Sequence, residues 1–171
     1  MIFLDAKPNK AHLKLAEMEQ AGKLSAIVTQ NIDGLHQAAG SKNVFELHGS
    51  VHRNYCQKCG KFFDVNYVVN AKGVPYCDEC GGIIKPDVVL YEEGLDSQTI
   101  NGAVRAISKA DMLIIGGTSL VVYPAAGMID YFKGKYLAVL NRDATSRDKQ
   151  ADLCITDPIG DCLLYTSPSP R

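Results

Sequence analysis

Short apolar runs alternate with amphipathic segments along most of the chain. Five runs are apolar and rich in branched aliphatic residues, as strands covered on both faces are: residues 25–29, 44–47, 112–115, 136–140 and 153–155. Repetition of strand and helix with such strands predicts a parallel sheet that has helices on both faces. The pattern therefore predicts an α/β fold.

The segments between these runs carry helical patterns. Pro8 suits the first turn of a helix and Gly22 suits its left-handed end, so we expect a helix between them. A second helix is expected from Ser97, a candidate N-cap, because apolar residues follow it at helical spacing: Ile100, Ala103, Val104 and Ile107. We also expect a short helical piece over 35–40 and a helix over 124–132.

Residues 51–87 interrupt this alternation. They hold four cysteines, several tyrosines and turn glycines, and we interpret them as an inserted, metal-stapled module of short strands. The predicted limits are 53–86 for the module, and 1–52 and 87–163 for the α/β part. Residues 164–171 contain two Ser-Pro steps, which continue neither a helix nor a central strand, so we expect a non-native or disordered tail.

Composition and charge narrow the functional classes. Hydrophobic residues make up 46% of the chain and charged residues 22%, which suffices for a packed core. The formal net charge is −1, so no electrostatic case for nucleic acid exists, and no apolar run is long enough to span a bilayer. The first residues do not resemble a signal peptide. We therefore expect the six cysteines in a reducing, cytoplasmic environment. No feature of the sequence sets an oligomeric state.

Four of the cysteines are spaced as metal ligands. Cys56-x-x-Cys59 and Cys77-x-x-Cys80 are separated by 17 residues, and two such pairs complete a tetrahedron of thiolates around Zn²⁺. Four protein ligands leave no open coordination position, so the zinc is expected to be structural. A redox CxxC and a pair of disulfides are the alternatives. Core positions are expected for the two cysteines that lack partner spacing: Cys154 and Cys162.

Polar clusters follow four of the predicted strands. In an open parallel sheet, ligands bind outside the carboxyl ends of the strands. The polar clusters lie at such ends, over residues 29–33, 46–49, 117–119 and 141–143. Taken singly each cluster has an ordinary explanation, because Gly-Thr-Ser is commonly a turn, a lone histidine is more often structural, and loop Asn and Asp usually bond local backbone. Together the clusters predict a nucleotide site.

Each cluster also has a chemical interpretation. The 117–119 segment offers a glycine for close backbone approach and two hydroxyl donors, which suits a phosphate or a ribose. Asn141 can bond ribose hydroxyls with its amide. His48 can act as a general base near neutral pH. Asn31 and Asp33 can bond a carboxamide as donor and acceptor. From the residues alone, we therefore interpret the chain as a nucleotide-binding α/β domain with a zinc module.

In order and spacing, these stretches resemble the sirtuin family. The resemblance runs from Asp5 to Leu163 and has a bacterial form. It implies a partial Rossmann-type parallel sheet with helices on both faces, plus an inserted zinc-ribbon module. It rests on TQNIDGLH at 29–36, ELHG at 46–49, the two CxxC pairs, KPDVV at 85–89, GTSL at 117–120, PAA at 124–126 and LN at 140–141.

The resemblance implies NAD-dependent removal of acyl groups, such as acetyl, from protein lysines, with nicotinamide and O-acyl-ADP-ribose as products. NAD would lie between the two modules, and His48 would deprotonate a ribose hydroxyl. The NAD contacts implied are Gln30, Asn31, Asp33, Gly117, Thr118, Ser119 and Asn141. An acyl-lysine peptide would be clamped as a strand by Val88, Val89, Leu120, Val121 and Val122.

The sequence departs from the family pattern in two places. A glycine-rich GAGxS loop and a cofactor loop with an arginine begin that pattern, and neither occurs in these residues. We therefore expect an N-terminally truncated chain without the βα unit that binds pyrophosphate, and little or no turnover from it alone. The second departure is the triplet at 91–93, Tyr-Glu-Glu, where many relatives have Phe-Gly-Glu.

Two functional classes stay open for the chain. One is the NAD-dependent protein deacylase, and the other is a non-catalytic module of zinc ribbon and partial Rossmann domain that binds peptide. An ordinary NAD(P) dehydrogenase is disfavoured, because no GxGxxG opens a βα unit. Release of nicotinamide that requires an acyl-lysine peptide would separate the first class from both others.

Overall fold

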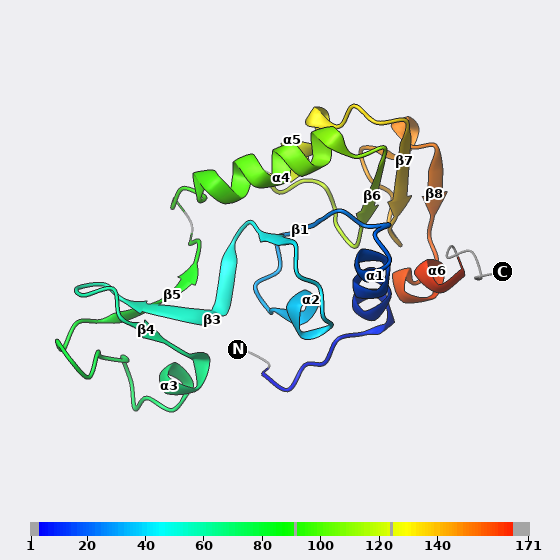
Figure 1. The fold of residues 1–171 in the computed structure, drawn as a ribbon. Coiled ribbons are helices and arrows are strands. Elements are labelled where there is room, and N and C mark those ends of the chain that lie inside the picture. Colours follow the sequence, from blue (N-terminus) through cyan, green and yellow to red (C-terminus); the bar gives the residue numbers. More distant parts are fainter. Residues whose placement is uncertain (1–3, 91, 124, 166–171) are drawn as a thin grey trace. The chain divides into compact units, whose positions relative to one another are not determined.

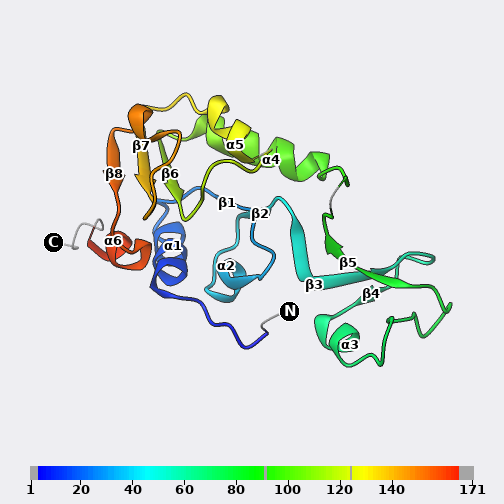
Figure 2. The same cartoon turned by 180° about the vertical axis from the view of Figure 1, so that it is seen from behind.

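The computed structural model describes residues 4–90, 92–123 and 125–165. The chain forms two compact units. Unit 1 comprises 1–28, 35–45 and 97–171, and unit 2 comprises 29–34 and 46–96. Unit 2 thus takes in more chain than the module predicted for 53–86, because the 29–34 turn and the residues after 46 pack with it. Figures 1 and 2 show the elements from opposite sides.

A parallel three-stranded sheet organises unit 1. Its strands are β6 (Met112–Gly116), β7 (Tyr136–Leu140) and β8 (Leu153–Ile155), in the order β6-β7-β8 (Figure 1). The register pairs Met112 with Tyr136 and Ala138 with Leu153. All three strands fall where the apolar runs predict them, so the expected parallel sheet is confirmed.

Helices cover both faces of this sheet. On one face, α1 (Lys10–Gln20) and α6 (Ile159–Tyr165) lie side by side in both views (Figures 1 and 2), and they pack on Ile114, Leu140 and Ile155. The other face carries Leu113, Ile115, Leu137 and Val139, which pack against Phe132 and the short helix η1 (Ile129–Tyr131). Successive strand residues point to opposite faces, so one apolar strand supplies both layers.

The helix boundaries differ from the prediction at several ends. α1 begins at Lys10 and not in the turn of Pro8, because Asn9 is the N-cap and accepts from the backbone N–H groups of Ala11 and His12. The left-handed stop at Gly22 is confirmed by its φ of +70°. α4 (Ser97–Lys109) contains Ser97 as its first residue, so Ser97 is not the residue before the helix.

Among the described residues, two α-helices and the short helix η2 (Asp148–Gln150) lack a counterpart in the prediction, and one helix is shorter than predicted. α6 places Cys162 and Leu163 in the core and includes Leu164 and Tyr165, so the predicted tail at 164–171 starts too early. α3 (Val65–Val69) lies inside the predicted all-strand module and is capped by the Asp64 side chain. The 124–132 helix is instead α5 (Ala125–Met128) followed by η1, and Pro124 lies outside the described residues, as do 166–171 of the tail.

The two strands nearest the N-terminus form a sheet of their own. β1 (Ile27–Thr29) pairs with β2 (Val44–Glu46), and α2 (Leu35–Ala38) lies between them in sequence. Among the described residues neither strand pairs with β6, β7 or β8, so the idea that all polar clusters end strands of one sheet is not borne out. Apolar runs predict that a strand exists, but its partner depends on contacts distant in sequence.

Unit 2 is built on an antiparallel sheet, in the region where a module of short strands was predicted. β3 (Gly49–Cys56) is the central strand, with β4 (Phe62–Phe63) on one side and β5 (Ile84–Val88) on the other. Its core contains Phe63 and Ile84 together with two buried cysteines: Cys56 and Cys77. Among the described residues, no helix of either unit is long and apolar enough to cross a membrane.

Candidate functional site

Four thiols of unit 2 converge on one point. The Sγ atoms of Cys56, Cys59, Cys77 and Cys80 all lie within 4.8 Å of one another. Cys56 Sγ is 3.4 Å from Cys80 Sγ, and Cys59 Sγ is 3.7 Å from Cys77 Sγ. Zinc–sulfur bonds of about 2.3 Å in a tetrahedron place sulfurs roughly 3.8 Å apart, whereas a disulfide needs about 2.05 Å. The quartet therefore fits a structural Zn²⁺, as predicted, and does not fit disulfides.

The two CxxC segments fold alike around this point. In each, the backbone N–H of the first cysteine donates to the carbonyl oxygen of the residue five positions later. Its own carbonyl oxygen accepts from the N–H of the residue four positions later, and all four bonds are 2.8–3.0 Å long. Backbone N–H groups of Cys59 and Lys58 point at the Cys56 sulfur and lower the pKa of that thiol to about 6. Such bonds favour the thiolate that a metal requires. Of the remaining cysteines, Cys162 is buried as expected, but Cys154 is exposed, so its predicted core position is wrong.

A hollow of about 430 Å³ brings the predicted catalytic residue together with predicted ligand contacts. It lies entirely within unit 2. Three chain segments form its wall, namely the turn after β1, the loop between β2 and β3, and the end of β5. The lining residues are Gln30, Asn31, Ile32, Asp33, His48, Val88 and Val89.

His48 is held in one tautomer by the backbone. Its Nδ1 lies 3.1 Å from the carbonyl oxygen of Gln30. A carbonyl only accepts, so Nδ1 carries the hydrogen and the lone pair of a neutral ring resides on Nε2. The carbonyl oxygen of His48 accepts from the backbone N–H of Val89 at 3.1 Å. One bond thus fixes the ring and another fixes the backbone that carries it, as a positioned general base requires.

The turn that carries Asn31 and Asp33 is also held by backbone bonds. The hydroxyl of Thr29 accepts from the Asn31 N–H at 3.1 Å, and the Thr29 carbonyl accepts from the Leu47 N–H at 2.9 Å. These bonds join the turn to the segment that leads into His48. The side chains predicted to bond a carboxamide thus lie beside the predicted base.

Gly49 allows His48 to lie this close to β5. Its φ is +77°, and an added Cβ would lie 1.9 Å from the carbonyl oxygen of Asp87. We expect Gly49→Ala to destabilise unit 2 by at least about 2 kcal/mol, because both the backbone conformation and the β3–β5 approach forbid a side chain. Urea unfolding of the variant measures this, with Gly73→Ala as a control that has a positive φ but open space around its Cβ. Equal losses for the two variants would contradict the close-approach argument.

The remaining predicted ligand contacts lie in unit 1. Gly117, Thr118 and Ser119 follow β6, and Asn141 follows β7, so they share the carboxyl edge of the parallel sheet. Gly117 has a φ of +62° and donates its N–H to the Leu140 carbonyl oxygen at 3.2 Å. The hydroxyl of Thr118 accepts from the Leu120 N–H, and the amide of Asn141 donates to the Asp143 carbonyl oxygen, so both side chains make local bonds.

The predicted peptide contacts divide between the units. Val88 and Val89 line the hollow of unit 2, whereas residues 120–122 belong to unit 1. Val121 and Val122 are exposed, at 70% and 51%, and the partly buried Leu120 packs against the sheet core. Exposed valines suit a surface that receives a ligand.

The Tyr-Glu-Glu triplet at 91–93, which departs from the family pattern, has at its middle residue the backbone conformation that a glycine favours. Glu92 has a φ of +70°, so it adopts the left-handed conformation at the position where relatives carry glycine. Glu93 accepts from the Leu90 N–H at 2.9 Å and pairs with Lys85 Nζ at 3.1 Å, and these two contacts lower the pKa of its carboxyl. Tyr91 lies outside the described residues.

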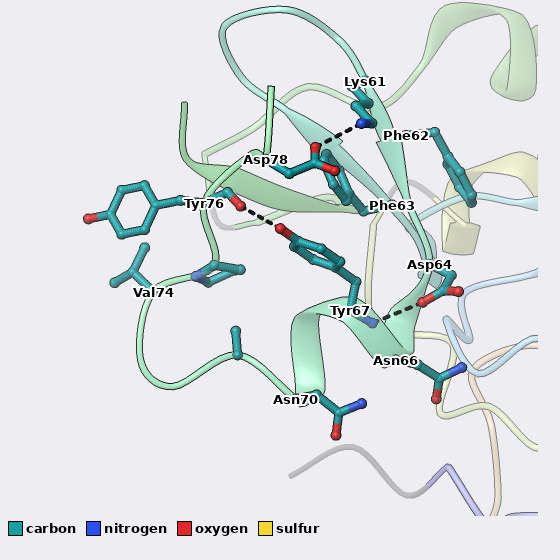
Figure 3. A pocket seen from close by; sticks show the side chains of 12 residues that line it. Lys61, Phe62, Phe63, Asp64, Asn66, Tyr67, Asn70, Val74, Tyr76 and Asp78 are labelled. Carbon is teal, nitrogen blue, oxygen red and sulfur yellow. Dashed lines mark hydrogen bonds and ion pairs between the residues drawn. The ribbon is translucent and has the colours of Figure 1, made fainter. Parts of the chain in front are cut away.

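A second hollow, of about 790 Å³, lies in the zinc module (Figure 3). Tyr67 donates its hydroxyl to the carbonyl oxygen of Tyr76 at 3.0 Å across it. Its carboxylates have structural partners, because Asp64 caps α3 and Asp78 pairs with Lys61 at 2.8 Å. No histidine or cysteine lines it.

Residues that the sequence pattern did not single out also reach the site. His52 and Arg53, on β3, bond to the turn of Asp33 and to the carboxylates of Glu46 and Asp87. Both follow the ELHG segment within a few residues, but charged residues on a strand usually face solvent. Only the pairing register of β3 reveals their direction.

Comparison with known proteins gives one consistent result. The model of the "Sir2 family" matches residues 1–124. An NAD-dependent protein deacetylase of Clostridium acetobutylicum is 66% identical over 164 residues, which covers 95% of this chain and 67% of the relative. The deacetylase of Clostridium tetani is 61% identical, with 95% and 66% covered. The chain therefore spans about two thirds of the length of these relatives.

Solved structures agree with these relatives. A Sir2 complex with a p53 peptide and NAD⁺ has a TM-score of 0.87 at 40% identity, covering 95% of this chain and 70% of the other. A Sir2 complex with an inhibitor, 2′-O-acetyl-ADP-ribose and a deacetylated p53 peptide also has a TM-score of 0.87, at 41% identity, with 95% and 71% covered. Both likenesses extend over unit 1 and unit 2.

Proposed function

The chain belongs to the Sir2 family, and on that basis we propose that it works as an NAD-dependent protein deacetylase. Its substrates are acyl-lysine side chains of proteins, and its products are the free lysine, nicotinamide and O-acyl-ADP-ribose. The names of the clostridial relatives and the ligands of the similar Sir2 structures support this assignment.

The observation that carries the proposal is the setting of His48. Its Nδ1–H is held by the Gln30 carbonyl oxygen, so Nε2 is the basic nitrogen in a hollow that Asn31 and Asp33 also line. A neutral imidazole of fixed tautomer beside amide and carboxylate groups is suited to remove a proton from a sugar hydroxyl. A binding module without chemistry has no need for that arrangement.

The residues of the hollow divide the work. Bound NAD supplies an electrophilic ribose carbon and nicotinamide as leaving group. Asn31 and Asp33 bond the carboxamide and orient the ring, and Gln30 lines the same wall. Nε2 of His48 accepts the proton of a ribose hydroxyl and holds it while the acyl group is transferred.

The peptide and the rest of the dinucleotide use the other predicted contacts. β5 is an outer strand of its sheet, so the backbone around Val88 can pair with an extended peptide. Residues 120–122 are the other peptide contacts that the family resemblance implies. Gly117, Thr118, Ser119 and Asn141 bind the phosphate and ribose groups of NAD at the edge of the parallel sheet.

The zinc quartet has a structural role in this proposal. Four thiolates close the coordination shell and leave no position for a substrate. A reducing compartment such as the cytoplasm keeps exposed Cys59 and its neighbours available for the metal.

A chimera tests the proposal without depending on residues outside this chain. In it, the 164 matched residues of the Clostridium acetobutylicum relative are replaced by those of this chain. We expect nicotinamide release that requires both NAD and an acetyl-lysine peptide, with much slower release from the 171-residue chain alone. Liquid chromatography of nicotinamide and of the deacetylated peptide measures both products. A folded, zinc-loaded chimera without peptide-dependent release would overturn the proposal.

A further inference from the structure

A wide bulge interrupts the pairing of β3 with β5. Ser50 pairs with Asp87 and Asn54 pairs with Pro86, so residues 51–53 of β3 have no partner on β5. Both ends of the bulge are closed by buried polar side chains. The Ser50 hydroxyl accepts from the His52 N–H at 3.3 Å, and the Asn54 amide donates to the Val51 carbonyl oxygen at 3.2 Å. The bulge is therefore a built element and not a frayed strand.

Two bulge residues hold the turn that carries Asn31 and Asp33. The Val51 N–H donates to the Ile32 carbonyl oxygen at 3.0 Å. Nε2 of His52 lies 2.9 Å from the Asp33 carbonyl oxygen, and since a carbonyl only accepts, Nε2 carries the hydrogen. Gly34 makes room for this ring, because an added Cβ would lie 2.8 Å from His52 Cδ2.

The third bulge residue holds the other two walls of the hollow. Arg53 donates to Glu46 Oε2 at 2.7 Å and to Asp87 Oδ2 at 2.8 Å. Glu46 stands two residues before His48, and its side chain is only 8% exposed. Burial opposes the positive charge of Arg53, but the bonds to the two carboxylates outweigh it and raise the pKa of Arg53. One guanidinium thus joins the His48 loop to the strand that ends at Val88.

We propose that His52 and Arg53 are positioning residues for the deacetylation site, with the 51–53 bulge as the frame that sets its three walls. The inference rests on the proposed function, and neither side chain lines the hollow itself. His52 fixes the carboxamide-binding turn through the Asp33 carbonyl. Arg53 fixes the base and the peptide-binding strand through two carboxylates. Such support matters because catalysis depends on geometry at the level of a few tenths of an ångström.

Amide hydrogen exchange on the zinc-loaded 171-residue chain tests the His52 part. We expect His52→Ala to speed exchange in the 30–34 turn and at the Val51 amide by about tenfold, because one anchor of the turn is lost. His52→Gln should restore most of the protection, since its side-chain N–H can reach the same carbonyl. Tyr55→Ser, an exposed change on β3 outside the bulge, should leave the turn unaffected.

The Arg53 part uses a compensating pair of variants. Arg53→Ala should speed exchange at the Val89 amide, which donates to the His48 carbonyl, and should also leave Glu46 buried without its partner. Adding Glu46→Gln removes the buried charge, so the double variant should fold. Hydrogen exchange at its Val89 amide should remain faster than in wild type. Arg53→Lys should rescue only partly, because an ammonium lacks the fork that joins two carboxylates.

A nicotinamide titration followed by NMR separates this inference from the proposed function. Wild-type chain should show shifts in the 30–34 turn, and His52→Ala should weaken that binding several-fold at unchanged zinc content. If wild type shows no nicotinamide shifts but the exchange changes occur, the frame stands and the carboxamide assignment fails. If His52→Ala and the double variant leave exchange in the 30–34 turn and at Val89 unchanged, the frame proposal is overturned.

Discussion

Replacing His48 by alanine is expected to lower peptide deacetylation by the chimera about 10²- to 10⁴-fold, the range that a positioned general base contributes. The loss should be in kcat, because the ring acts on a developing alkoxide and not on the ground-state ligands. His48 is partly buried, and its ring bonds only a backbone carbonyl among the contacts that the structure records. Its removal should therefore cost little stability.

Steady-state rates at saturating peptide and NAD measure this effect. Val74→Ser is a suitable control, because Val74 is 54% exposed and lines only the second hollow of the zinc module. It should leave kcat unchanged. Deacetylation by His48→Ala within threefold of the wild-type chimera would remove the general-base role and would favour a binding function for the hollow.

The parts of the site that were predictable are those set by short-range sequence. A CxxC segment fixes its own turn, so two of them predict four converging thiols, and the structure brings Cys56, Cys59, Cys77 and Cys80 together. Gly117 was likewise predicted to allow close backbone approach after a strand, and it has a positive φ of +62°. These features need no knowledge of which strand pairs with which.

The parts that were not predictable depend on long-range pairing. The side chains of His52 and Arg53 bond to the walls of the hollow only because β3 slips by three residues against β5, and a register shift leaves no mark in hydrophobic periodicity. β1 and β2 show the same limit, because both were predicted as strands while their separate pairing was not. α6 was missed for a different reason, since its apolar residues adjoin a Ser-Pro tail.

β3 connects the cysteine quartet to the hollow that His48 lines. The strand starts at Gly49, directly after His48, and ends at Cys56, a zinc ligand, with the 51–53 bulge between them. β5 repeats this relation, because Ile84 packs in the cysteine core and Val88 lines the hollow. A structural zinc that fixes one end of both strands therefore determines the geometry at their other ends.

Cys77→Ser is accordingly expected to unfold unit 2 while unit 1 stays folded. Structural zinc contributes roughly 10–16 kcal/mol of apparent binding free energy in zinc-finger peptides, which is comparable to the whole stability of a domain, about 5–15 kcal/mol. Cys77 is buried in the core of unit 2 beside Phe63 and Ile84, so loss of the metal should also disrupt that core. Elemental analysis should find one zinc per wild-type chain and almost none in the variant.

Hydrogen exchange locates the damage. Amides of β3 and β5 should lose protection in Cys77→Ser and after treatment of wild type with a strong chelator, whereas amides of β6, β7 and β8 should keep theirs, because those strands belong to unit 1. Cys154→Ser is the matched control, since Cys154 is exposed and lies outside the quartet, and it should retain both zinc and protection. Suppose that Cys77→Ser keeps the amides of β3 protected and still shows nicotinamide-dependent shifts at 30–34. The hollow would then form without the metal, and the link through β3 would be wrong.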